Sequence, residues 1–200
     1  MSARHHQAFT LVEILVVFVI ISLLIGLAIP SLRDIEGSAR LTDSADRIVR
    51  IFRLARQHAT TENRRIEVRF YRFADPDSPR SEVAYRAVML TAPDENGGGE
   101  QLSGLFRFPA GLALAGDTNL SSVLRLGKEG IDNRFPVEEV RPTPFVGVTF
   151  RANGTIDGPP SEKYFVTLWS EREAKIQTPP RDYITIQVDP VSGGIETFRP

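Results

Sequence analysis

No cysteine occurs among the 200 residues, and only three histidines are present. The absence of cysteine excludes disulfide bonds and thiolate metal sites. Two of the histidines, His5 and His6, lie near the start of the chain, so His58 is the only one in the remaining sequence. A single histidine without cysteine supplies neither a zinc site of the usual type nor a Cys–His catalytic pair. We therefore expect no metal centre, no cofactor and no enzymatic activity.

The chain has no large excess of either charge, because its 24 Lys and Arg residues nearly balance its 25 Asp and Glu residues. A dedicated nucleic-acid binder is normally strongly basic, so we expect no nucleic-acid partner. Nucleotide-binding motifs are absent as well. The glycine run Gly97–Gly99 lacks the lysine and the helix start that follow the glycines of a phosphate-binding loop.

A calcium site with carboxylate ligands is the one kind of metal site that the composition still allows. The candidates fall in two predicted loops: Asp75 and Asp77, then Asp94, Glu95 and Glu100. Neither group has the spacing of a defined calcium loop, so polar surface loops explain them better.

A long apolar run fills the N-terminal part of the chain. Between Ile14 and Ile29 only Ser22 and Gly26 interrupt it, and Phe9–Val12 extend it forwards. The run approaches the roughly 20 residues that cross a bilayer as a helix. A short, weakly positive head precedes it, which indicates a cytoplasmic start, and no small-x-small cleavage site follows. The sequence predicts one transmembrane segment, and periodicity alone does not distinguish it from a plain signal anchor.

The block Ala8-Phe9-Thr10-Leu11-Val12-Glu13 resembles the signal of type IV prepilins and type II secretion pseudopilins. The resemblance implies that a prepilin peptidase cleaves between Ala8 and Phe9 and then N-methylates Phe9. Glu13 then occupies the fifth mature position, where this family has a glutamate. Pro30 falls where many such helices have a proline, and a kink is expected there because proline removes a helical hydrogen bond. One residue departs from the pattern, since the family prefers glycine where this chain has Ala8.

Glu13 has a physical role under this resemblance. A carboxylate inside the hydrocarbon region costs roughly 2.5–3.5 kcal/mol at a helix centre and somewhat less near a helix end. Cleavage before Phe9 creates an α-amine that is protonated near neutral pH, about 6 Å along the axis from Glu13. Pairing with the amine of a neighbouring subunit penalises wrong registers, because an unpaired buried charge costs several kcal/mol. Glu13 is therefore expected to mark the assembly register.

A second helical stretch follows the apolar run. Its apolar residues recur at three-four spacing on one face: Leu41, Ala45, Ile48, Phe52, Ala55 and Ala59. Arginines fall to the side and opposite, at positions 47, 50, 53 and 56. This basic strip suits lipid head groups or nucleic acid in principle, but a solvated helix face is the better interpretation. The first stretch is expected to end near Gly37 and Ser38, whereas the family resemblance implies a near-continuous helix.

After Asn63 the apolar period changes to two, which predicts β-strands. In Ile66–Phe73 one face is apolar and the other carries Glu67, Arg69 and Tyr71, as in a half-buried strand. The other expected strands are Val83–Leu90, Leu105–Phe108, Leu120–Leu126, Phe145–Arg151, Lys163–Ser170 and Asp182–Asp189, the last forming a hairpin with the segment 195–199. One helix followed by mostly antiparallel strands is an α+β arrangement.

The segments 148–158 (VTFRANGTIDG) and 183–199 (YITIQVDPVSGGIETFR) resemble the C-terminal half of minor pseudopilins of the GspH type. The helical stretch together with the segments 65–73, 85–90 and 105–114 resembles the Verru_Chthon cassette protein D family, over nearly the whole chain. The resemblance implies a pilin-like fold with four parts: a leader (1–8), a membrane and assembly helix (9–32), an amphipathic half-helix (33–62) and an extracytoplasmic β-rich domain (63–200). It implies a single-pass protein of the bacterial inner membrane. Its implied partners are prepilin peptidase, other pilin or pseudopilin subunits and an inner-membrane assembly platform. A membrane-anchored ligand-binding module that does not polymerise remains the alternative.

Overall fold

The computed structural model describes residues 10–76, 81–94, 99–175 and 178–200, and for residues 26–35 it describes the backbone alone. The chain forms two compact units, Met1–Ala39 and Arg40–Pro200. The second unit contains all the strands and all the buried hydrophobic residues among those described.

A single helix, α1 (Leu11–Thr61), contributes residues to both units. It passes through Pro30 and Gly37 without interruption, so the expected helix end near Gly37 and Ser38 is wrong and the near-continuous helix is confirmed. The physical reason is that one glycine inside a helix costs only about 1 kcal/mol, which the neighbouring turns offset. The kink at Pro30 stays a prediction, because its side chain lies outside those described. The helix stops two residues before Asn63, which adopts a left-handed φ of 50°.

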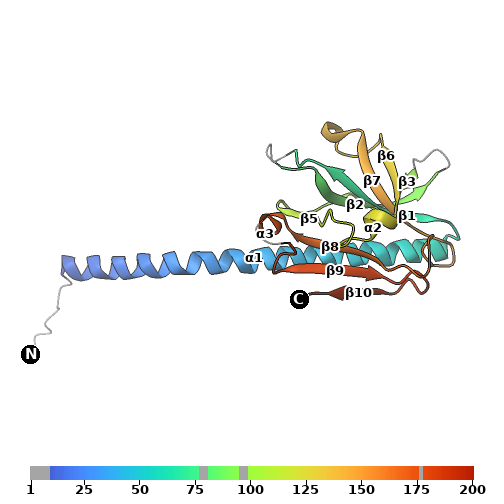
Figure 1. The fold of residues 1–200 in the computed structure, drawn as a ribbon. Helices are drawn as coiled ribbons and strands as arrows, with labels where there is room; N and C mark the ends of the chain where they lie inside the picture. The colour runs from blue at the N-terminus through green and yellow to red at the C-terminus, as the bar shows by residue number, and fades with distance from the viewer. Residues whose placement is uncertain (1–9, 77–80, 95–98, 176–177) are drawn as a thin grey trace, which may run out of the picture. The chain divides into compact units, whose positions relative to one another are not determined.

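The described strands form one antiparallel sheet in the order β10-β9-β8-β5-β2-β1-β7-β6, with β3 and β4 also pairing with β2 (Figure 1). The strands are β1 (Ile66–Phe73), β2 (Ala84–Pro93), β3 (Gly99–Gln101), β4 (Phe106–Arg107), β5 (Leu112–Leu114), β6 (Lys128–Asp132), β7 (Thr143–Phe150), β8 (Tyr164–Ser170), β9 (Tyr183–Val188) and β10 (Ile195–Phe198). Two short helices, α2 (Val123–Leu126) and α3 (Glu171–Ala174), and a 3₁₀ turn (Glu138–Val140) connect them. The predicted α+β fold class, a long N-terminal helix with a mostly antiparallel sheet, is confirmed.

The strand predicted at Leu120–Leu126 is wrong, because this segment turns into α2. Instead of pairing as a strand, this segment uses two serine side chains to form hydrogen bonds with the backbone of β8 and of the residue before it. Ser122 Oγ donates to the Lys163 carbonyl (2.6 Å) and accepts from the Phe165 N–H (2.9 Å). Ser121 Oγ accepts from the Thr167 N–H (3.1 Å). These hydroxyls satisfy backbone groups of β8 where β5, which pairs only with its last three residues, does not reach.

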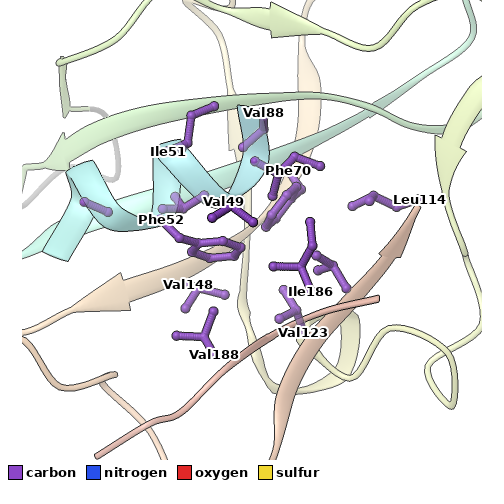
Figure 2. Packing of buried hydrophobic residues seen from close by; sticks show 14 of the residues in the cluster. Val49, Ile51, Phe52, Phe70, Val88, Leu114, Val123, Val148, Ile186 and Val188 are labelled. Atoms are coloured by element: carbon purple, nitrogen blue, oxygen red, sulfur yellow. The ribbon is translucent and has the colours of Figure 1, made fainter. Parts of the chain in front are cut away.

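The main core lies between the second half of α1 and one face of the sheet. All six residues of the predicted apolar stripe are buried, so this prediction is confirmed. Phe52 packs against Phe70 and Phe150, with ring centroids 5.9 Å and 6.3 Å away. Figure 2 shows Phe52 near Val148 of β7 and Val188 of β9, two strands that lie far apart in the sheet order. The predicted solvent face is also confirmed, since the arginines at positions 47, 50, 53 and 56 are all exposed.

The opposite face of the sheet carries a second, smaller core, which corrects the expectation of a half-buried β1. Tyr71 and Phe73 pack there with Phe135 and Phe145. Because side chains alternate along a strand, this face also receives Glu67 and Arg69. Both are 2% exposed. Charged residues in alternation had predicted a solvated face, and here they are buried because they neutralise one another.

Candidate functional site

The segment Leu11–Ile25 of α1 presents an apolar surface on every side. Every large hydrophobic side chain from Leu11 to Ile25 is exposed, with exposed fractions from 46% at Val17 to 81% at Leu11. Ser22 is the one hydroxyl in this segment, and its Oγ donates to the Phe18 carbonyl (2.8 Å) inside the same helix. Soluble monomers rarely expose contiguous apolar patches of this kind, which normally mark an interaction surface.

Glu13 is the only charged residue between Leu11 and Ile25, and the structure gives it a local partner. Thr10 precedes the first helical residue, and its Oγ1 accepts from the Glu13 N–H (3.2 Å). In return, the Thr10 N–H donates to Glu13 Oε2 (3.4 Å). This reciprocal pair is a capping box, in which Thr10 is the N-cap and Glu13 the third helical residue. The carboxylate also lies in the first turn, where the helix dipole favours negative charge.

The capping box is the functional geometry that sequence reasoning missed. Its signal was present, because Thr-x-x-Glu directly before an apolar run is the sequence pattern of this cap. The cap holds the Glu13 carboxylate at the end of the helix that follows Phe9 in the chain. Phe9 and Ala8, the residues of the predicted cleavage site, lie outside the described residues, and so does the leader.

Among the residues that the structure describes, none of the helices combines the length and the hydropathy of a membrane-crossing segment. The predicted segment runs over residues 9–32, and the side chains of Phe9 and of residues 26–32 are outside those described. Its transmembrane assignment therefore stays a prediction.

A separate cavity of about 440 Å³ lies at the junction of β2, β5 and β8. Tyr85 and Trp169 line it, together with Arg72, Leu114 and Glu171. Its volume is within the range of small-ligand pockets. Trp169 of β8 is half-buried and contributes to this wall. This cavity is the feature that favours the alternative of a ligand-binding module.

The residues weighed for metal or acid–base chemistry do not come together. No group of three or more potential metal ligands occurs within the described parts of the chain. Asp77 and Glu95, two of the calcium candidates, lie outside those parts. Asp75 accepts from Arg107 Nη2 (3.0 Å), and Glu100 pairs with Arg64 (2.9 Å). His58 contacts Glu62 one turn further along the helix, and this contact lowers the pKa of the Glu62 carboxyl.

Comparison with known proteins gives a family match at the N-terminus and structural matches over most of the chain. Residues 3–29 match the family model described as the prokaryotic N-terminal methylation motif. The chain carries a prokaryotic N-terminal methylation motif. No curated protein matches the sequence. Among solved structures, the chain is similar to the type IV minor pilin FimU of Pseudomonas aeruginosa, with 15% identity, a TM-score of 0.46 and coverage of 80% of this chain and 92% of that one. It is also similar to the minor pseudopilin EpsH from the Type 2 Secretion System of Vibrio cholerae, with 11% identity, a TM-score of 0.45 and coverage of 80% and 98%.

Proposed function

We propose that this protein is a pilin-like structural subunit, a minor pseudopilin of a type II secretion or type IV pilus-like filament. Prepilin peptidase cleaves it between Ala8 and Phe9 and methylates Phe9. The exposed apolar segment then packs among the helices of other pilin or pseudopilin subunits, at a platform in the bacterial inner membrane. The domain Arg40–Pro200 faces the extracytoplasmic side, and the subunit has no enzymatic role.

The observation that carries the proposal is the combination found in one short segment. A methylation motif covers residues 3–29. Within that range, the helix from Leu11 to Ile25 exposes apolar side chains all round and has Glu13 as its one charge. A helix that is apolar on every side belongs inside a protein assembly or a membrane. A single acid at its end matches a partner that carries one positive charge, and a processed N-terminal amine is such a partner.

Substitutions at Glu13 test the proposal by separating its two possible roles. Glu13→Gln retains the capping box, because glutamine serves at this position as glutamate does, but it removes the charge. We expect both Glu13→Gln and Glu13→Leu to lower incorporation into filaments by at least about tenfold, since a buried amine without a counter-charge costs several kcal/mol. The measurement is the amount of subunit in sheared or cross-linked filaments relative to total membrane protein.

Ser22→Leu is the matched control, because it also removes a polar side chain from the same segment and Ser22 bonds only to its own helix. It should incorporate normally. Normal incorporation of Glu13→Gln together with loss in Glu13→Leu would assign Glu13 to helix capping alone. Normal incorporation of both variants would contradict the register role and favour an anchored binding module that uses the cavity beside Trp169.

A further inference from the structure

Arg53 and Arg56 lie one turn apart on the exposed face of α1, in the unit Arg40–Pro200. They line a cavity of about 430 Å³ together with Gln57, Thr60, the turn residues 193 and 194, and the first residue of β10. None of the lining residues is acidic. The cavity therefore carries two positive charges and no negative charge of its own.

The stem of Arg56 is held between two turns that come from distant parts of the sequence. Gly154 and Gly193 both have positive φ angles, 82° and 66°. A Cβ at position 154 would lie 3.3 Å from Arg56 Nε, and a Cβ at position 193 would lie 2.8 Å from Arg56 Cδ and Nε. Only glycine adopts these angles at no steric cost, and only glycine leaves room for this arginine. The two turns thus pack against the stem of Arg56 beside the cavity, and this restriction of the stem lowers the entropic cost of binding.

Neither arginine has a counter-ion among the described residues. Other arginines of the same unit have carboxylate partners: Arg64 with Glu100, Arg151 with Asp157, and Arg199 with Asp182. Like charges three residues apart on a helix are mutually destabilising by a few tenths of a kcal/mol. A solvated helix face explains exposed arginines, but it does not explain why two of them border an acid-free cavity with one stem fixed by two glycine turns.

We propose that Arg53 and Arg56 form a binding site for a phosphate-type oxyanion, a doubly charged phosphomonoester or inorganic phosphate. A guanidinium donates two parallel hydrogen bonds to such a group. Two guanidiniums on adjacent turns need more than the two oxygens of one carboxylate, and a tetrahedral phosphate supplies at least three. Its charge of about −1.5 to −2 at pH 7 also matches the two arginines. The source is either free phosphate or a phosphomonoester on a lipid head group. This site is independent of the assembly role proposed above.

Phosphorus NMR titration of the full chain in a non-ionic detergent tests the site at low salt. One arm uses inorganic phosphate, and the other uses a short-chain phosphatidic acid, with the matching phosphatidylcholine, a zwitterionic phosphodiester, as the control without net charge. Arg53→Gln/Arg56→Gln should weaken binding at least about tenfold, because it removes several charge-assisted hydrogen bonds. Arg50→Gln/Arg181→Gln removes the same total charge from exposed positions outside the cavity, and it should bind within about twofold of the unaltered chain.

Each result decides the proposal. Binding of inorganic phosphate that requires Arg53 and Arg56 supports a free anion as the source, and binding of the phosphatidic acid alone supports a lipid head group. Thermal unfolding of the double variant, compared with the unaltered chain, shows that the fold is retained. No binding in either arm would overturn the proposal. Equal binding by the double variant, or acetate binding as tightly as phosphate, would overturn it as well.

Discussion

Replacement of Arg69 by methionine is expected to lower the free energy of unfolding by about 3–5 kcal/mol. Arg69 is buried on the second face of β1, and its Nε donates to Glu67 Oε2 (2.5 Å). Its Nη1 lies 3.8 Å from Asp132 Oδ2, and its guanidinium carbon lies 4.2 Å from the centre of the Phe145 ring. Without Arg69, two buried carboxylates have no positive partner. Such uncompensated charges are what makes the loss large.

The residues around Glu67, Arg69 and Asp132 accommodate these charged side chains. Tyr71 donates to Asp132 Oδ2 (2.8 Å), and burial together with the Asp132 carboxylate raises the pKa of the Tyr71 hydroxyl well above its ordinary value, so the hydroxyl stays a donor at neutral pH. Gly147 lies opposite Arg69 in the β1–β7 ladder, and any Cβ there would collide with the Glu67 carboxylate. The cluster therefore depends on one glycine of the neighbouring strand as well as on its own members.

Arg65→Met is the matched control for Arg69. Arg65 directly precedes β1, its side chain is 67% exposed, and its Nη2 lies 3.4 Å from Asp157 Oδ2. Its replacement should change stability by less than about 0.5 kcal/mol. Chemical denaturation of the full chain in detergent gives both values. In Glu67→Gln/Arg69→Met the loss should be smaller than the sum of the single losses, because the two residues are in contact. Equal stabilities for Arg65→Met and Arg69→Met would contradict the buried cluster.

Phe52→Ala is expected to destabilise the chain by about 3–5 kcal/mol. Phe52 is 1% exposed and joins the helix to the sheet through Phe70 and Phe150. Its removal leaves a cavity between α1 and the sheet. These two layers are in contact along the whole apolar stripe, so the cavity cannot close unless one layer shifts against the other. Thermal or chemical unfolding measures the loss.

Leu54→Ala serves as the control within the same helix. Leu54 is 43% exposed on the opposite side from the core, so its replacement should cost less than about 0.5 kcal/mol. A comparable loss for both variants would mean that the helix face is assigned wrongly. A small loss for Phe52→Ala alone would mean that the helix contributes little to the fold of the domain.

Local pattern was sufficient for the helix and the longer strands. The three-four spacing from Leu41 to Ala59 predicts the buried stripe because it is imposed by the helix period itself. The bounds Ile66–Phe73 follow in the same way from period two. Short strands were predicted only in part. β4 and β10 lie inside predicted segments, whereas β5 has three residues and was not predicted, because it exists only where β2 and β8 lie on either side of it. The segment at Leu120 reads as a strand, but tertiary contacts of its serines with β8 make it a helical turn.

The sites also differ in whether a local sequence pattern predicts them. The Thr10–Glu13 cap is a local pattern, readable from four consecutive residues. The burial of Glu67 and Arg69 was not readable, because alternating charges indicate a solvated face until Asp132 and Phe145 arrive from other strands. The cavity at Arg53 and Arg56 depends on two glycine turns far along the chain, and helix periodicity alone assigns both arginines to solvent.

The most direct test of the assembly proposal is the intact mass and N-terminal sequence of the protein extracted from its native membrane. The proposal predicts a chain that begins at N-methylated Phe9, without residues 1–8. That product requires recognition by a prepilin peptidase, and it places the amine next to Glu13 as the register role demands. A chain that still begins at Met1, or one cleaved elsewhere, would contradict the proposal and would leave Glu13 as a helix cap on an anchored binding module.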